Sequence, residues 1–409
     1  NLINSESKIL FNRNPRERVA KVAPWLTLDG DPYPAIIDGK ILWIIDGYTT
    51  SAGYPNSRVV NLANTGDALT SRSNAVSSLD DRNVNYIRNS VKATVDAYDG
   101  TVSLYQWDAK DPVLATWSKA FPGSVKPRSE ISPDLLSHIR YPEDMFRVQR
   151  DILSAYHVTT ADAFYGGQDF WRVPLDPSSF GANSANQPPY YLTMQIPGQS
   201  KPTFSLYTPF VPRGGRENLT ALAVVNADAG DEYGKITVLQ LPRSTNVPGP
   251  SQVASNFEAK PEVATSLSLL RQGGADVVLG NLLTLPVGKG LLYVQPVYVR
   301  ATGNTAAYPL LQRVLVSFGD QIVFSETLQG ALDQVFGGDS GTDASNNQPN
   351  TPVNEGAGTS QAIRSAIASL QSAFSDLEAA QKRLDGAAED RARARVKAAI
   401  AALISAQNR

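Results

Sequence analysis

Residues 31–49 read Asp-Pro-Tyr-Pro-Ala-Ile-Ile-Asp-Gly-Lys-Ile-Leu-Trp-Ile-Ile-Asp-Gly-Tyr-Thr. Two runs rich in β-branched and aromatic residues meet at Asp38-Gly39, a pair that tolerates the positive φ angles of a two-residue turn. The stretch therefore predicts a β-hairpin. A second pair of the same kind, Asp46-Gly47, predicts a further turn.

The segments around the hairpin mix helical and strand patterns. Residues 80–100 predict a helix capped by Asp80-Asp81. Residues 101–107 alternate as a strand does, and Asp111-Pro112 starts another helix. We therefore expect a mixed α/β part over residues 1–130. The apolar face of the helix predicted for residues 80–100 would carry Val84, Ile87, Val91 and Val95.

Residues 131–187 predict a helical part, and residues 188–336 a β-rich part. Ser132-Pro133 starts one helix, and Pro142-Glu143-Asp144 starts a second that runs to Tyr156. The β-rich part contains short apolar runs joined by hairpin-length loops, which favours an antiparallel or mixed sheet. The predicted fold class is α+β. Helices are predicted within the β-rich part over residues 251–257, 261–272 and 327–336.

The C-terminal end has a different composition. Residues 337–359 are rich in Gly, Ser, Asn and Asp, with few large apolar residues, which predicts a flexible, disordered linker. Residues 360–409 predict an amphipathic helix or a helical hairpin, because apolar residues recur at helical spacing on both sides of Gly386. We expect this segment to dock on the chain's own body, on a partner protein or on a second copy.

Composition limits the classes of function. The chain has 409 residues, a net charge of −2, no cysteine and two histidines. Without cysteine there are no disulfides, no thiolate metal sites and no Cys nucleophile, and two histidines argue against a His-rich zinc site. The net charge offers no overall attraction for nucleic acid. We therefore predict no metal, no cofactor and no nucleic-acid partner.

The best candidate surface for ligand binding or interaction lies around residues 138–149. A His and an Arg beside carboxylates, at a helix broken by proline, can bind an anion or transfer protons. The same residues also fit a helix junction held by Arg–carboxylate pairs, and we favour that structural interpretation. No residue is assigned a catalytic role. The candidate residues are His138, Arg140, Glu143, Asp144, Asp46 and Tyr48.

The second histidine and the remaining acidic residues have structural explanations. His157 follows a predicted helix end, where a histidine interacts favourably with the helix dipole. The acidic residues between Asp29 and Asp46 lack the spacing of a calcium-binding EF-hand loop. The chain also lacks the Gly-rich nucleotide-binding, His-Glu-x-x-His and Gly-x-Ser-x-Gly motifs.

Several blocks of the chain resemble uncharacterised protein family 0182 (UPF0182), over roughly residues 10 to 335. The resemblance implies a region of a large bacterial or archaeal membrane protein, of a kind frequent in actinobacteria. Membrane helices in the family lie in the N-terminal half, so this chain would be the C-terminal extracytoplasmic part. Its start at Asn1 rather than at methionine agrees with a longer polypeptide. The blocks are the hairpin and residues 89–92, 111–114, 138–149, 156–158, 280–283 and 292–298.

The leading hypothesis from this resemblance is a non-enzymatic extracytoplasmic domain at the cell membrane, acting as a cell-envelope scaffold, assembly or ligand-binding module. The family has no established catalytic residues. Its expected partners are the membrane half of the same full-length chain and an envelope protein, or a second copy, bound through residues 360–409. An accessory domain of a transporter is one alternative.

The other alternative is an envelope hydrolase or transferase that acts on glycan or lipid. It requires one concave pocket in which His138 and Arg140 converge with at least one carboxylate. The carboxylates in question are Glu143, Asp144 and Asp46.

Overall fold

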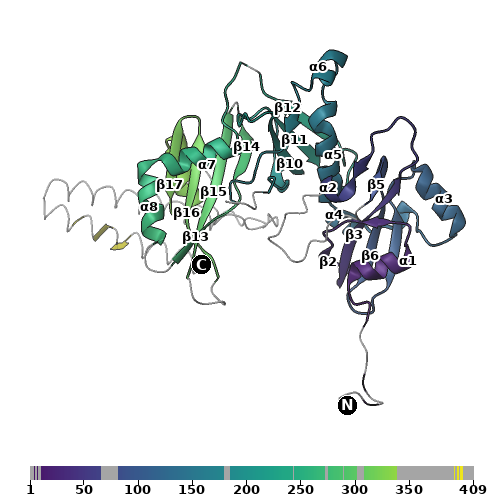
Figure 1. Ribbon diagram of the computed structural model, residues 1–409. Coiled ribbons are helices and arrows are strands. Elements are labelled where there is room, and N and C mark those ends of the chain that lie inside the picture. The colour runs from purple at the N-terminus through teal and green to yellow at the C-terminus, as the bar shows by residue number, and fades with distance from the viewer. Residues whose placement is uncertain are drawn as a thin grey trace. The chain divides into compact units, whose positions relative to one another are not determined.

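The structure is a computed structural model of the chain (Figure 1). It describes residues 4, 7, 11–65, 82–178, 185–242, 244–271, 275–288, 290–301, 308–338, 391, 394, 395, 397 and 398. The chain divides into two compact units, residues 1–342 and residues 343–409. Residues 339–359 of the linker predicted for residues 337–359, and most of the helical segment predicted for residues 360–409, lie outside the described residues.

The first sheet contains the predicted hairpin. Its strand order is β1-β3-β6-β7, with β2 also paired to β3, and all of these pairs are antiparallel. Asp38 and Gly39 connect β2 to β3 with φ angles of 49° and 77°, as a two-residue hairpin turn requires. The hairpin prediction is confirmed. The strands are β1 (Thr27–Leu28), β2 (Tyr33–Ile37), β3 (Lys40–Ser51), β6 (Tyr86–Asp96) and β7 (Val102–Gln106).

The positive φ angle at Gly39 leads to a prediction about stability. Gly39→Ala is expected to destabilise the chain by about 1 kcal/mol, because a Cβ atom disfavours the left-handed region. The added Cβ would meet no atom within 4 Å, so the effect would come from the backbone alone. The control is Gly53→Ala, at a glycine without a positive φ angle. Denaturant unfolding measures both, and equal stabilities would contradict the expected strain.

Two predictions for this sheet are wrong. Residues 83–96 form β5 (Asn83–Val84) and β6 rather than a helix. The spacing of Val84, Ile87, Val91 and Val95 favours a helix, although Ser90 to Val95 alternate between polar and apolar residues as a strand does. Residues 90–95 of β6 are all buried, so the polar side chains of this strand also face the interior. Asp46-Gly47 lies inside β3 rather than in a turn, because the strand continues through this pair to Ser51.

A β-bulge beside Gly47 decides where the polar side chains of β6 point. Gly47 pairs with Val91 and Tyr48 pairs with Asn89, so Ser90 is an extra residue in β6. In a regular strand, residues 89 and 92 would face opposite sides of the sheet. With the bulge, the side chains at both positions contact the same carboxylate.

Short helices surround the first sheet. Helix α1 (Pro15–Val22) is capped by Asn14 and helix α3 (Pro112–Ala120) by Asp111, and both begin with proline. The start of α3 at Asp111-Pro112 confirms the prediction. The remaining short elements before residue 131 are β4 (Val60–Asn61), which pairs with β5, α2 (Leu62–Thr65) and the 3₁₀ turn η1 (Arg128–Glu130).

The helical middle begins where the sequence predicts. Ser132 caps α4 (Pro133–His138) by accepting the Leu135 N–H at 3.1 Å. Helix α5 (Glu143–Tyr156) starts directly after Pro142, and α6 (Ala161–Gly166) follows it. Proline suits both starts because the first turn of a helix does not use its N–H groups internally.

Two more antiparallel sheets follow, which confirms the α+β class. Their strand orders are β12-β11-β10-β8, with β9 paired to β10, and β13-β15-β16-β17, with β14 paired to β15. The strand predicted over residues 277–285 is two strands. The strands are β8 (Trp171–Arg172), β9 (Tyr190–Met194), β10 (Thr203–Pro212), β11 (Ala221–Asn226), β12 (Ile236–Gln240), β13 (Ala275–Leu279), β14 (Leu283–Val287), β15 (Gly290–Ala301), β16 (Leu310–Phe318) and β17 (Gln321–Ser325).

The three helices predicted within the β-rich part are confirmed. They are α7 (Pro250–Ala259), α8 (Pro261–Arg271) and α9 (Leu328–Phe336). Among the described residues, no helix combines the length and the hydrophobicity that crossing a bilayer requires.

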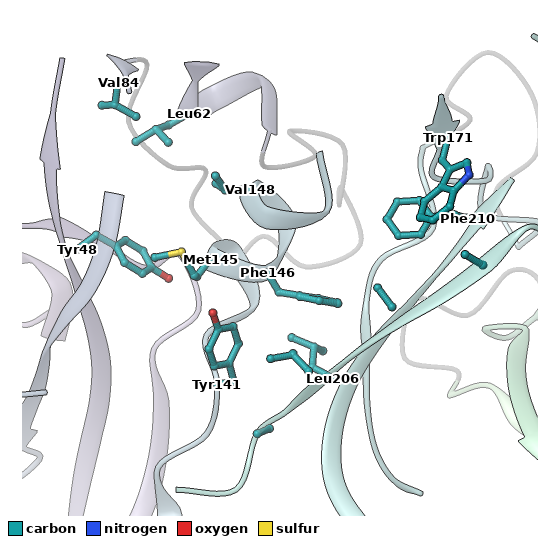
Figure 2. Packing of buried hydrophobic residues seen from close by; sticks show 14 residues of the cluster. Tyr48, Leu62, Val84, Tyr141, Met145, Phe146, Val148, Trp171, Leu206 and Phe210 are labelled. Atoms are coloured by element: carbon teal, nitrogen blue, oxygen red, sulfur yellow. The ribbon is translucent and has the colours of Figure 1, made fainter. Parts of the chain in front are cut away.

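A hydrophobic cluster joins the first two sheets through α5 (Figure 2). In this view Met145 of α5 lies beside Tyr48 of β3, and Phe146 points toward Leu206 of β10. Because α5 is covered on several sides, its charged side chains are buried together with its apolar ones. The buried charged residues of α5 are Asp144, Arg147 and Arg150.

Candidate functional site

Five of the six predicted residues lie in one polar cluster, most of it buried, which we call the charged junction. Its residues come from the β1–β2 connection, β3, β6 and the segment that enters and begins α5. The charged junction consists of Asp29, Asp31, Asp46, Tyr48, Asn89, Lys92, Arg140, Glu143, Asp144 and Arg147. His138 is the predicted residue that lies outside it.

The centre of the charged junction is a buried ion pair between Asp46 and Lys92. Asp46 is only 3% exposed, and Lys92 is only 1% exposed. The bulge in β6 places Asn89 on the same side as Lys92, and its amide donates to Asp46 at 2.8 Å. Burial raises the pKa of Asp46 and lowers the pKa of Lys92, and their mutual attraction opposes both shifts.

Lys92 also binds groups that are far away in the sequence. Its Nζ donates to the Tyr233 hydroxyl at 2.8 Å and to the Arg140 carbonyl at 3.3 Å. It lies 5.2 Å from the ring centroids of both Trp107 and Tyr233. One ammonium group therefore connects the first sheet to the helical middle and to the loop before β12.

Asp144 connects the start of α5 to the β1–β2 connection. Its Oδ2 accepts the Gly30 N–H at 2.8 Å, and its Oδ1 lies 3.9 Å from Nη1 of Arg147. Burial and the nearby charge of Asp29 raise the pKa of Asp144 to about 7, although the Gly30 N–H and Arg147 oppose the shift. Burial also raises the pKa of Glu143, against the attraction of Arg147.

Tyr48 is held as a neutral hydrogen-bond donor. It is fully buried, and its hydroxyl donates to Oδ2 of Asp29. Oδ1 of Asp29 accepts the Asp31 N–H at 2.8 Å. Burial and the adjacent Asp29 charge raise the pKa of Tyr48 well above its ordinary value, so the phenol keeps its proton.

Arg140 lies at the edge of the charged junction. Its Nη2 donates to Asp31 at 2.8 Å, and its guanidinium lies 4.0 Å and 4.7 Å from the ring centroids of Tyr33 and Tyr191. Burial raises the pKa of Asp31, and the Arg140 charge opposes that shift. Arg140 is thus both paired and stacked, which fits a fixed structural cation.

His138 lies apart from the carboxylates of the charged junction. Its Nδ1 is 2.8 Å from the Asp134 carbonyl oxygen and 3.7 Å from the Asp134 carboxylate. His138 and Arg140 line a cavity of about 650 Å³, but Glu143, Asp144 and Asp46 are not among its lining residues. Within the described residues, this cavity therefore lacks the arrangement that the hydrolase or transferase alternative requires.

The two histidines line different cavities. His157 ends α5, where Nδ1 lies 2.9 Å from the Leu153 carbonyl, and its ring stacks on Trp171 with centroids 3.4 Å apart. Its position at the helix end is the one expected from the sequence. His157 lines a different cavity, of about 460 Å³.

The sequence interpretation missed several members of the charged junction, and above all Lys92. The run Val91-Lys92-Ala93-Thr94-Val95 carries one signal, a lysine inside a β-branched stretch. A buried lysine needs an anionic partner. The helix predicted for this segment hid that signal, because it would have left Lys92 on a solvated face. Asn89, Asp29, Asp31 and Arg147 carry no comparable local signal.

The buried carboxylates of the charged junction accept hydrogen bonds or ion pairs from the same cluster. Among the described residues, no group of three or more Asp, Glu or His side chains is arranged to hold a metal ion. The arrangement can exchange a proton at Asp144 near neutral pH.

Comparisons with known proteins agree on one family. The model of the uncharacterised protein family UPF0182 matches residues 1–270. A UPF0182 protein of Leifsonia xyli subsp. xyli is 49% identical over 100% of this chain and 46% of its own length. UPF0182 proteins of Thermobifida fusca and Bifidobacterium adolescentis are 57% and 55% identical over 83% of this chain, covering 33% and 32% of their lengths. No solved structure matches the chain.

Proposed function

This chain belongs to the uncharacterised protein family UPF0182, and we propose that it is a non-catalytic binding and assembly domain on the extracytoplasmic side of a longer cell-envelope membrane protein. The charged junction is the observation that carries the non-catalytic part of this proposal. The chain spans less than half the length of the relatives described above, which supports a role as one region of a larger protein.

Catalysis by acid or base requires a titratable side chain within reach of the substrate. Asp46, Tyr48 and Asp144 are 3%, 0% and 5% exposed. Each is bonded to another part of the same chain, so these side chains hold segments together instead of facing a ligand. Binding and assembly therefore fit the site better than hydrolysis or group transfer does.

The proposed partners follow from the chain's place in a longer protein. We assign the membrane half of the full-length protein as one partner. Residues 360–409 are assigned as the segment that contacts an envelope protein or a second copy, because their apolar stripe needs a surface to cover it.

The location can be tested by cysteine labelling, because this chain contains no cysteine. Tyr98 is 76% exposed and Ala93 is fully buried. In intact cells that make the full-length protein, a membrane-impermeant maleimide is expected to label Tyr98→Cys. Ala93→Cys, the buried control, is expected to react only after denaturation, and the unsubstituted protein supplies the background. Protection of Tyr98→Cys until the cells are lysed would contradict an extracytoplasmic location.

A further inference from the structure

A cavity of about 820 Å³ lies beside the C-terminal half of α5, and its lining is rich in arginine. Five arginines and two carboxylates line it, and one of the arginines, Arg147, pairs with Glu143 outside the lining, so the local charge is positive whereas the whole chain carries −2. This volume is in the usual range for small-ligand sites. We call it the arginine cavity. Its charged lining residues are Arg58, Arg147, Arg150, Arg172, Arg213, Asp151 and Glu217.

Three of these arginines are held in place by the protein. Arg147 pairs with Glu143, and Arg172 pairs with Glu217. Arg150 is 3% exposed and donates to the Gln187 carbonyl at 2.9 Å. These contacts fix positive charge in the wall of the cavity, so a bound anion would meet guanidinium groups that are already ordered.

The other two arginines are exposed and contact aromatic rings. The Arg58 guanidinium lies 5.9 Å from the ring centroid of Tyr156, and that of Arg213 lies 5.9 Å from Phe170. Within the described part of the chain, no carboxylate lies within ion-pair distance of either one. Their N–H donors thus remain available to a ligand, and a guanidinium binds phosphate oxygens through paired N–H groups.

Exposed aromatic side chains form a rim beside these arginines. Tyr165 of α6 is 97% exposed, and its neighbour Phe164 packs edge-on against Phe170 with centroids 5.3 Å apart. Phe164 also contacts Tyr156, whose ring centroid lies 5.2 Å away. All four rings line the arginine cavity. Aromatic groups gathered at a charged cavity suit a ligand with an apolar part next to its anionic group.

We propose that the arginine cavity binds a phosphate ester, with the phosphate at Arg58 and Arg213 and the organic part against the aromatic rim. Two arginines without a carboxylate partner among the described residues, Arg58 and Arg213, suit a doubly charged phosphate monoester better than a single carboxylate. This inference deepens the binding role proposed above, because it names the ligand class. It concerns the cavity alone, so it is tested on the purified chain, independently of membrane topology.

Isothermal titration calorimetry tests the proposal with three probes. They are glycerol phosphate, dihexanoyl phosphatidic acid at monomeric concentrations, and dihexanoyl phosphatidylcholine as the probe without net charge. Both phosphate monoesters are expected to bind, and the phosphatidylcholine to bind about tenfold more weakly or not at all. Absence of binding by both phosphate monoesters overturns the proposal.

Charge variants test the position of the site. Arg58→Gln combined with Arg213→Gln is expected to weaken phosphate binding about tenfold or more, whereas Arg300→Gln on β15 is the control that leaves it unchanged. Asp151→Asn removes a lining carboxylate that, in the described part of the chain, pairs with none of the five arginines, and it is expected to tighten binding. Unchanged affinity in the double arginine variant overturns the proposal. Since Arg58 and Arg213 are exposed, the double arginine variant and the Arg300→Gln control should both unfold at the same temperature as the wild-type protein.

Tyr165→Ser, a substitution in the aromatic rim, distinguishes a lipid headgroup from a soluble phosphate ester as the ligand. If phosphatidic acid binds more tightly than glycerol phosphate, and Tyr165→Ser removes the difference, the ligand is a lipid headgroup with its attached chain. If the two probes bind equally and Tyr165→Ser has no effect, the ligand is a soluble phosphate ester. Both results support a phosphate-ester site and differ only in its source.

Discussion

Lys92→Met is expected to destabilise the chain by about 3–5 kcal/mol, because it leaves the Asp46 carboxylate buried without its cation. Lys92 is 1% exposed, and methionine has a similar length, so the lost charge rather than a lost volume would dominate. Denaturant unfolding at neutral pH measures the change. A further substitution, Asp46→Leu in the same chain, removes the orphaned charge and is expected to restore more than half of the lost stability.

The matched control for this prediction is Lys40→Met. Lys40 also pairs with an aspartate, Asp96, at 3.4 Å, but its side chain is 65% exposed. An exposed ion pair of this kind contributes about 1 kcal/mol or less, since solvent screens it. If both methionine variants unfold at the same denaturant concentration, the Asp46–Lys92 pair does not stabilise the charged junction.

Asp144→Asn is expected to make the chain more stable above pH 7 and to change the pH dependence of its stability. The pKa of Asp144 is about 7 in the folded chain, compared with 3.8 for an aspartate that makes no interactions, as in the unfolded chain. Between these values the folded chain binds more protons than the unfolded chain, so rising pH destabilises the fold. The loss approaches 1.4 kcal/mol per pH unit, or roughly 4 kcal/mol in total as an upper bound.

Unfolding of both proteins from pH 4 to pH 8 measures this effect. The difference in free energy of unfolding, variant minus wild type, should increase with pH and level off above pH 7. Asparagine keeps an oxygen that accepts the Gly30 N–H, so the backbone contact is preserved. The control is Asp231→Asn, at an exposed carboxylate, with an expected change below about 0.5 kcal/mol. A variant-minus-wild-type difference that is constant across pH would contradict the raised pKa of Asp144.

Five residues of the charged junction are predicted from two local features of the sequence. Arg140, Glu143 and Asp144 were selected because they adjoin a proline-started helix, and Asp46 and Tyr48 because they adjoin the hairpin. The structure brings these two groups together, but around Lys92 and not around His138. Gly30, which donates to Asp144, and Asp46, which pairs with Lys92, are separated from them by long stretches of chain, and no local pattern connects them.

The sequence by itself determined the features that depend on neighbouring residues. Asp38-Gly39 forms the hairpin turn, and the proline-started helices α3, α4 and α5 begin where Asp111, Ser132 and Pro142 indicate. These signals are local because turn angles and helix caps involve residues within a few positions of one another.

Only the tertiary structure decided that residues 86–96 form a strand, that Ser90 is an extra residue in its pairing, and that Lys92 is buried against Asp46. Residues 90–95 alternate between polar and apolar residues, but Val84, Ile87, Val91 and Val95 also have helical spacing, and no local signal ranks one pattern above the other. Distant segments bury all of residues 90–95, including the polar ones. The ionisation of Asp144 likewise depends on burial and on Asp29, which lies in another part of the chain. Burial and charge pairing arise from contacts between distant segments, so they become definite only when the chain is folded.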